Sequence, residues 1–262
     1  MNAIPQLRNE LEALARRAGR MMTDRPEFSV DQKEGHANFV TTVDRAVRQL
    51  LEKELPPLVP GSRFIGEENE NAPLTDAPTW VVDPVDGTTN LIHDLKMSAV
   101  SVALLCDRQP VLGLIYQPYL DEMFYAEKGR GTELNGKPVR VSTCAFDRAL
   151  VCFGTSPYTP DLAERSLKSA LQFLYACADI RRSGSAAIDL AGVACGRCDV
   201  YFEYTLKPWD FAAGALLVTE AGGVFDMPFT GHGIDFSRPG GVLAASPECY
   251  EKARKLLFPG EA

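Results

Sequence analysis

The spacing of apolar residues along the chain changes near residue 60. Segments 4–22 and 42–55 repeat apolar positions every three to four residues, which predicts two amphipathic helices. The proline-rich stretch that begins at Pro56 is expected to end the second helix. From about residue 62 to residue 143, short apolar runs alternate with glycine-containing turns, the pattern of strands and hairpins. The first part of the chain is therefore predicted to hold two helices and a sheet.

Beyond residue 145, strand-like and helix-like segments alternate. The helical segments are 161–178, 186–195, 208–223 and 248–258. Alternation of this kind is typical of a layered α/β architecture. We therefore divide the chain into an N-terminal α+β half, residues 1–145, and a C-terminal α/β half, residues 146–262, and we expect the two halves to pack tightly.

Composition and charge narrow the choice of partners. The 262 residues allow one or two domains, and 45% hydrophobic with 24% charged residues is the balance of a globular protein. Acidic residues outnumber basic ones by 35 to 27, which gives a formal net charge of −8. This charge offers no basic field to nucleic acid or to an anionic membrane surface. A negatively charged substrate would need local neutralisation, for instance by bound cations.

The sequence shows no feature of a membrane or exported protein. Its apolar runs are far shorter than the about 20 residues of a transmembrane helix, and the charged N-terminal segment lacks the apolar region of a secretory signal. The seven cysteines are an odd number, and their spacing suggests no disulfide framework. We therefore expect a cytoplasmic protein without a membrane partner.

A Cys-x-x-Cys motif stands at Cys195–Cys198, where it could be half of a zinc site or a redox pair. A zinc knuckle needs a second pair of ligands, and none follows along the chain. The preceding segment is typical of the end of an apolar helix, and Gly196 suits such an end. We therefore favour two small core residues over a metal or redox site.

Carboxylates follow apolar segments abruptly in three stretches of the chain. They are Glu67, Glu68, Asp83, Asp86 and Asp210. A carboxylate directly after a buried strand is costly unless it is paired, hydrogen-bonded or bound to a metal. Several such acids in one protein therefore suggest a shared cation.

The segment from Trp80 to Thr89 suggests how such a site would be built. Pro84 is expected to stop the strand after Val82, which leaves the carbonyl of Val85 without a ladder partner. Asp86 lies three residues beyond Asp83 and can turn back toward the same point. Carboxylate and carbonyl oxygens are the ligands that Mg²⁺ prefers.

A phosphate cradle is predicted immediately after these acids. Gly87-Thr88-Thr89 is typical of a helix start, and the free N–H groups of a helix N-terminus bind phosphate. A metal site beside a phosphate cradle suits metal-assisted hydrolysis of a phosphate ester. The alternative is that the segment is a plain turn and that Asp210 only caps its helix. The presence of all three acidic segments favours the metal site.

These segments resemble the metal motifs of the inositol monophosphatase family: a Glu-Glu pair, D-P-[apolar]-D-G-[ST] and W-D-x-A-A/G. They stand here at Gly66–Asn69, Asp83–Thr88 and Trp209–Ala213, in the family's order and rough spacing, and the resemblance extends over nearly the whole chain. It implies a mixed α/β fold, the αβαβα layered sandwich of inositol monophosphatase and fructose 1,6-bisphosphatase. It also implies a homodimer and Mg²⁺ as cofactor. The N-terminal half would carry most metal motifs, and the C-terminal half would carry Asp210 and the substrate side.

The family pattern, carried over residue by residue, implies the ligands of two Mg²⁺ ions. The first ion would take Glu67, Asp83 and the carbonyl of Val85, and the second Asp83, Asp86 and Asp210. Glu67 would share a weaker third ion with water. With these ions bound, water would attack the phosphate in line, without a covalent phosphoenzyme.

The resemblance also implies roles around the substrate. Thr88 would position the attacking water with Glu67, and Asp44, in the T-x-x-D segment that starts at Thr41, would support Thr88. The N–H groups of Gly87 and Thr88 would bind the phosphate. The remaining substrate contacts would come from Asp86, Gly184, Ser185, Ala186, Glu203 and Asp210.

Other interpretations stay open at several of these positions. Lys33 matches a lysine near the family's metals, yet a loop lysine is usually just solvated. Asp44 in a first helical turn is favourable to the helix dipole in any case, and Glu203 could be an ordinary exposed strand residue. Arg181 and Arg182 could be a surface or dimer feature rather than a phosphate clamp.

The predicted activity is phosphate monoester hydrolysis, with myo-inositol 1-phosphate as the first substrate to consider. Relatives act on fructose 1,6-bisphosphate, adenosine 3′,5′-bisphosphate or histidinol phosphate. The nucleotide enzymes typically carry lysine where Thr89 stands, which favours inositol phosphate here. Leu91 departs from the family's usual phenylalanine, which weakens inference about the substrate but not about the metals. A non-catalytic regulatory subunit on the same fold is the alternative from another class.

Overall fold

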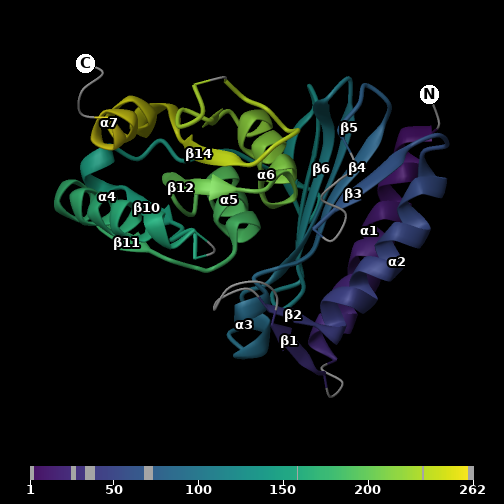
Figure 1. Cartoon of the computed structure of the whole chain (residues 1–262). Helices are drawn as coiled ribbons and strands as arrows, with labels where there is room; N and C mark the ends of the chain where they lie inside the picture. Colours follow the sequence, from purple (N-terminus) through teal and green to yellow (C-terminus); the bar gives the residue numbers. More distant parts are fainter. Residues whose placement is uncertain are drawn as a thin grey trace.

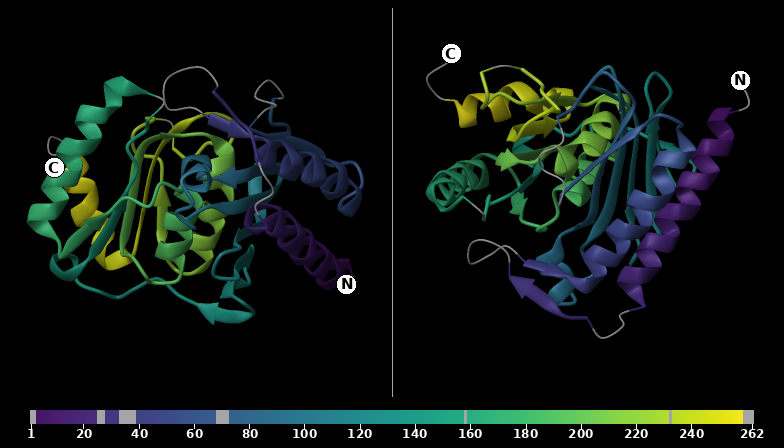
Figure 2. Two further views of the ribbon diagram at one scale, coloured as in Figure 1. Left: turned by 90° about the horizontal axis from the view of Figure 1, so that it is seen from below. Right: turned by 45° about the vertical axis from the view of Figure 1, so that its right-hand side comes forward.

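The computed structural model describes residues 3–24, 28–32, 39–67, 73–157, 159–231 and 233–258. Within these ranges, layers of helices alternate with two sheets, and α1 and α2 lie at one side of the molecule while α4 and α7 lie at the other (Figures 1 and 2). This is the αβαβα sandwich that the resemblance implies. The prediction of a mixed α/β fold is confirmed.

Helices α1 (Ala3–Thr23) and α2 (Thr42–Leu58) form one outer layer. Their buried apolar residues, among them Leu11 and Leu51, pack on one face of the larger sheet. Thr41 caps α2 because its hydroxyl accepts the Asp44 N–H at 3.3 Å, while its own N–H donates to the Asp44 carboxylate at 2.9 Å. α2 ends at Leu58, inside the proline-rich stretch that was predicted to end it, and Pro56 and Pro57 lie in its last turn.

The larger sheet has seven strands in sequence order. They are β3 (Arg63–Gly66), β4 (Thr79–Asp86), β5 (Ala99–Cys106), β6 (Gln109–Gln117), β7 (Glu122–Glu127), β8 (Gly131–Leu134) and β9 (Lys137–Val139). β3 and β4 are parallel, and every later pair is antiparallel. The strands and hairpins predicted between residues 62 and 143 are therefore present.

A middle layer of α5 (Ala186–Ala194) and α6 (Pro208–Glu220) lies between the two sheets (Figure 1). Nearly every residue of α6 after its first turn is buried, as expected for a helix covered on both sides. It approaches the larger sheet over a row of small residues, in which Ala103, Gly113 and Ala126 pair across three strands. A Cβ added at Gly113 would lie 2.8 Å from the carbonyl oxygen of Ala213.

Replacing Gly113 by Ala is expected to destabilise the protein by about 1–3 kcal/mol, because α6 must move off the sheet to admit the methyl group. Urea unfolding followed by circular dichroism measures this change. Gly192→Ala is the control, since its Cβ would meet only the Cys198 sulfur at 3.1 Å. Equal free energies of unfolding for the two variants would contradict the close approach of α6.

The smaller sheet follows the order β11 (Asp179–Arg181), β10 (Leu150–Phe153), β12 (Val200–Leu206), β14 (Gly240–Ala245) and β13 (Val224–Asp226). Helices α4 (Ala163–Ala176) and α7 (Pro247–Leu257) cover its outer face. The sequence pattern did not indicate β13, the short pair β1 (Val30–Gln32) and β2 (Phe39–Thr41), or the 3-10 turns Phe146–Arg148 and Pro160–Leu162. All are only three residues long, too short to show a period.

The two halves of the chain share one hydrophobic core. The largest cluster of buried side chains joins residues of the larger sheet, such as Ile115, to α5, α6 and the smaller sheet. The division at residue 145 as a domain boundary stays a prediction. Cys198 is buried in this core and Gly196 follows the end of α5 with φ +73°, as the interpretation of the Cys-x-x-Cys motif required. Among the described residues, no helix is both long and apolar enough to cross a membrane.

Candidate active site

The fold brings the predicted acids to one edge of the larger sheet. Glu67 directly follows β3, and Asp83 and Asp86 lie near the end of β4. Because β3 and β4 are parallel and Gly66 pairs with Val82, the next residue on each strand, Glu67 and Asp83, are neighbours. Asp210 joins them from the first turn of α6.

β4 differs from the prediction around Pro84. The strand does not stop there but continues to Asp86, with Asp83 opposite Ser101 and Asp86 opposite Ala99. Pro84 and Val85 therefore stand opposite a single residue, which is a β-bulge. Pro84 has no N–H to donate to the neighbouring strand, and at a bulge no such hydrogen bond is needed. The bulge also takes Val85 out of the regular ladder. The Thr88 hydroxyl oxygen lies 3.2 Å from the Val85 carbonyl oxygen.

Burial and repulsion between the acids, in that order, set the electrostatics of this cluster. Burial raises the pKa of Asp83 well above its usual value, and the negative charges of Glu67, Asp86 and Asp210 raise it further. The pKa of Asp210 is raised for the same reasons, burial first and Asp86 next. A cation placed among these groups would act in the opposite direction and lower their pKa values.

Asp86 is held by the C-terminal half. Its Oδ2 accepts hydrogen bonds from the Ser185 hydroxyl and from the Ala187 N–H, both at 2.6 Å. Burial raises the pKa of Asp86 to about 6, although these two hydrogen bonds act to lower it. Both described bonds fall on one oxygen, which leaves Oδ1 as the atom to face a cation. The described bonds of Asp83 and Asp210 also fall on single oxygens, from the N–H groups of Val85 and Lys207.

The acid side chains are near one another without being closed into a ligand set. Within the described part of the chain, no three acids, histidines or cysteines already stand in an arrangement that could hold a metal. The assignment of Glu67, Asp83, Val85, Asp86 and Asp210 as metal ligands stays a prediction. Glu68 and Lys33 lie outside the described residues.

Thr88 and Asp44 are brought together from positions 44 residues apart. The Thr88 hydroxyl donates to Asp44 Oδ1 at 2.7 Å, as the family pattern implies. Burial raises the pKa of Asp44, and the hydrogen bonds from Thr41 and Thr88 act against this rise. A hydroxyl has one proton, so a Thr88 that donates to Asp44 keeps its lone pairs for a water molecule.

Replacing Thr88 by Val is expected to lower kcat about a hundredfold, because the hydroxyl that would orient the water is lost. Thr88→Ser keeps the hydroxyl and should stay within about tenfold of the wild type. Thr89→Val, on the exposed neighbour in the short helix α3 (Thr88–Ile92), is the matched control. Steady-state phosphate release measures all three, and a Thr88→Val variant as active as Thr89→Val would remove Thr88 from the mechanism.

Glu203 is buried, so the interpretation of an ordinary exposed strand residue is wrong. Its carboxylate accepts hydrogen bonds from the Ser156 N–H at 2.8 Å and the Tyr201 hydroxyl at 2.7 Å. Burial raises its pKa. The side chain fills the space beside Gly154, where an added Cβ would lie only 1.9 Å from Glu203 Oε2. Its charge also raises the pKa of Asp86, which places it close to the acid cluster.

Asn90 is a buried residue of this site that the sequence analysis gave no role. Its amide nitrogen donates to the carbonyl of Met97 at 2.6 Å and to that of Ser183 at 2.9 Å. It therefore ties α3 to the Gly184–Ala186 turn, which belongs to the other half of the chain. In the sequence, only its position directly after the D-P-V-D-G-T-T segment could have indicated that Asn90 belongs to the site.

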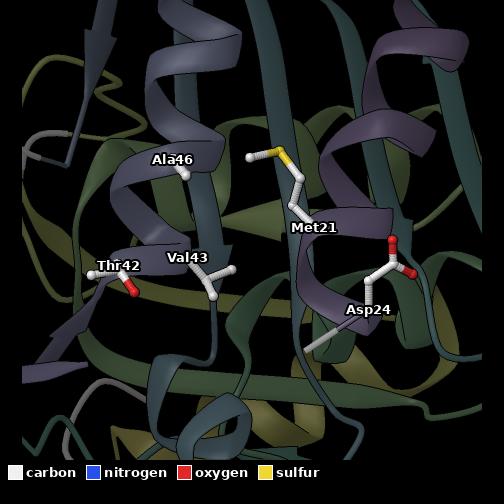
Figure 3. A pocket seen from close by; sticks show the side chains of 5 residues that line it. All are labelled: Met21, Asp24, Thr42, Val43 and Ala46. Carbon is white, nitrogen blue, oxygen red and sulfur yellow. The ribbon is translucent and has the colours of Figure 1, made fainter. Parts of the chain in front are cut away.

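A separate cavity of about 500 Å³ lies between the end of α1 and the start of α2 (Figure 3). Figure 3 shows the Met21 side chain extending from α1 toward α2, with Asp24 just beyond the end of α1. The lining is completed by Thr42, Val43 and Ala46. A single carboxylate in a mostly apolar lining does not suit a phosphate ester, so we place the candidate site at the acid cluster instead.

Comparison with known proteins agrees with the motifs and the fold. Residues 5–257 match the model of the inositol monophosphatase family. Inositol monophosphatase 2 of Solanum lycopersicum is 41% identical over 202 residues, 74% of this chain and 76% of that protein. The Nus factor SuhB of Escherichia coli K12 is 38% identical over 238 residues, 89% and 88% of the two chains.

Solved structures share the fold over its full length. The extragenic suppressor protein suhB of Bartonella henselae superposes with a TM-score of 0.85 at 31% identity, covering 97% of this chain and 99% of that one. The order of the motifs, the layered fold and the match over residues 5–257 lead to one conclusion. This chain belongs to the inositol monophosphatase family.

Proposed function

We propose that the protein is a Mg²⁺-dependent phosphate monoester hydrolase that releases phosphate from myo-inositol 1-phosphate. The observation that carries the proposal is the cluster of Glu67, Asp83, Asp86 and Asp210, in which burial and the charges of the neighbouring acids raise the pKa values of Asp83 and Asp210. Such a cluster costs stability unless a divalent cation offsets it. Oxygen donors alone suit Mg²⁺ better than softer metals.

The oxygen ligands of this cluster can be divided between two Mg²⁺ ions. A third ion would bind more weakly, held by Glu67 and water. Glu67, Asp83 and the Val85 carbonyl would hold the first ion, and Asp83, Asp86 and Asp210 the second. When bound, the metal would neutralise phosphate oxygens and lower the pKa of a coordinated water. Asp83 is central to both sets, and it is also the group whose pKa is raised by all three other acids.

The remaining residues would hold the water and the ester. The Thr88 hydroxyl donates its proton in a hydrogen bond to Asp44, so the oxygen of Thr88 would accept a hydrogen bond from the attacking water. Gly87 and Thr88 begin α3, where backbone N–H groups have no acceptor within the helix and would donate to the phosphate. Gly184, Ser185, Ala186 and Glu203 would border the hydroxyl-bearing part of the substrate, together with Asp86 and Asp210.

Phosphate release from myo-inositol 1-phosphate, with and without Mg²⁺, tests the proposal. Fructose 1,6-bisphosphate, adenosine 3′,5′-bisphosphate and histidinol phosphate are run beside it. Release that needs Mg²⁺ and favours the inositol ester supports the assignment. Preference for another ester would keep the chemistry and change the substrate, whereas no release from any ester at saturating Mg²⁺ would refute it.

A regulatory role is the second candidate, because one relative at 38% identity is named a Nus factor. The two candidates differ in what the acids are for. A regulator that keeps the fold has no need of Thr88 donating to Asp44 at 2.7 Å beside the acid cluster. A protein that binds Mg²⁺ with raised thermal stability but releases no phosphate would fit the regulatory candidate.

We also propose a cytoplasmic homodimer, on family grounds. All seven cysteines are free thiols, which suits a reducing compartment. The outer face of α4 exposes large apolar side chains of the kind that subunit contacts cover, namely Leu167, Leu171, Leu174 and Tyr175. Light scattering after size-exclusion chromatography measures the mass. The absence of nucleic-acid and membrane partners stays a prediction from the net charge.

A further inference from the structure

Asn90 joins three segments of the chain beside the predicted phosphate cradle. Its side chain is buried, and its amide nitrogen donates to the carbonyl oxygens of Met97 at 2.6 Å and Ser183 at 2.9 Å. Both partners are acceptors, so only the nitrogen of the amide can face them. Ser183 belongs to the C-terminal half, 93 residues further along the chain. One side chain therefore links α3, the loop that follows it and the Gly184–Ala186 turn.

The two halves of the chain approach each other closely at this junction. A Cβ added at Gly87 would lie 3.4 Å from the carbonyl oxygen of Gly184 and 3.4 Å from the amide nitrogen of Asn90. A Cβ added at Gly184 would lie 3.0 Å from the side-chain oxygen of Asn90. Both glycines have positive φ, +94° and +87°, which disfavours any side chain there. Asn90 therefore packs directly against both turns that would hold the substrate.

Other hydrogen bonds hold each side of the junction separately. The Ser98 hydroxyl donates to the Gly87 carbonyl at 2.8 Å, which fixes the start of α3 within the N-terminal half. On the other side, the Ser185 hydroxyl donates to Asp86 at 2.6 Å, which ties the turn to the acid cluster. These bonds do not involve Asn90. Replacing Asn90 should therefore leave both sides in place and remove the direct link between α3 and the turn.

We propose that Asn90 is a positioning residue that sets the spacing between the phosphate cradle and the turn that borders the substrate body. This rests on the proposed function, which places the phosphate at Gly87 and Thr88 and the hydroxyl-bearing body at Gly184–Ala186. A ligand that touches both elements gains affinity from their fixed spacing, because binding does not have to order them. A ligand that touches only the cradle gains nothing from that spacing.

Asn90→Ala separates these two kinds of ligand. KM for myo-inositol 1-phosphate should rise about tenfold with kcat largely retained, whereas the inhibition constant of inorganic phosphate should stay within about twofold. Asn90→Ser, the milder change, should show the same split at smaller size. Ser98→Ala should weaken both ligands alike, because it loosens the Gly87 turn itself. Asn135→Ala is the control and should change neither, since its amide donates to the Asp121 carbonyl at 2.9 Å near the far edge of the larger sheet.

A binding measurement separates this inference from the proposed function. Calorimetric titration with Mg²⁺ present compares inorganic phosphate with the phosphonate analogue of myo-inositol 1-phosphate, in which a C–P bond replaces the cleaved C–O–P link. Affinity lost by Asn90→Ala for the analogue alone supports the inference even if the wild type hydrolyses no ester. Equal loss for both probes, or no loss for either, would overturn it without affecting the proposed function. A wild type that binds neither probe would overturn both.

Discussion

Replacing Asp83 or Asp210 by Asn is expected to abolish Mg²⁺-dependent phosphate release and to stabilise the metal-free protein. Loss of either proposed ligand should lower kcat by about a thousandfold, because charge stabilisation in the transition state is lost. Without metal, each substitution replaces a buried acid, whose pKa is raised by burial and by neighbouring acids, with a neutral amide. The free energy of unfolding at pH 7 should therefore rise by about 1–3 kcal/mol.

The opposite signs of the two effects are what make this experiment sharp. A residue needed only for folding would lose activity and stability together. Asp189→Asn is the control, because Asp189 is also buried with a raised pKa but belongs to neither proposed ligand set. The Asp189→Asn variant should keep phosphate release and should lose the cost of burying the Asp189 carboxylate. An Asp83→Asn or Asp210→Asn variant that retains more than about a tenth of the wild-type rate at saturating Mg²⁺ would refute the ligand assignment.

Local sequence predicted most elements because most of them bury one face. Apolar residues recur every three to four positions in α1 and α2 because one face of each helix packs on the larger sheet. The hairpins were predicted from their glycine-containing turns. The proline-rich stretch from Pro56 ends α2 as predicted, with Pro56 and Pro57 tolerated in its last turn. The error at Pro84 has a physical reason. Pro84 was expected to stop β4, but a bulge removes the need for its missing N–H.

The site residues that belong to the family's motifs could be predicted from the sequence. Contacts that depend only on the tertiary structure could not. The hydrogen bond between Thr88 and Asp44, 44 residues apart, was predicted from two family motifs, because no local sequence rule relates the two residues. The buried state of Glu203 depends on Gly154, which directly follows the neighbouring strand β10. Ser185 and Ala187 bind Asp86 across about 100 residues of sequence. Contacts of this kind follow from how the layers stack, which a linear pattern does not encode.

The stability of the metal-free protein is expected to fall as pH rises from about 4 to about 6. The pKa of Asp86 is about 6 in the folded protein against an ordinary value of 3.8, so between these values the folded state holds a proton that the unfolded state has lost. Stability is therefore complete below the lower value and reduced above the upper one. The difference of about two pKa units corresponds to about 3 kcal/mol for this one group. Thermal unfolding followed in a pH series measures it.

Mg²⁺ should reverse this loss, because the cation binds the ionised carboxylates and not the protonated ones. At pH 7, saturating Mg²⁺ should raise Tm by about 5–10 °C, and at pH 4 it should raise it little. Asp86→Asn isolates the contribution of the group, since its metal-free profile should be flatter between pH 4 and 6. Equal concentrations of NaCl control for general screening. A Mg²⁺ shift of the same size at pH 4 and pH 7 would mean that the ion binds elsewhere than at the acids of β4 and α6.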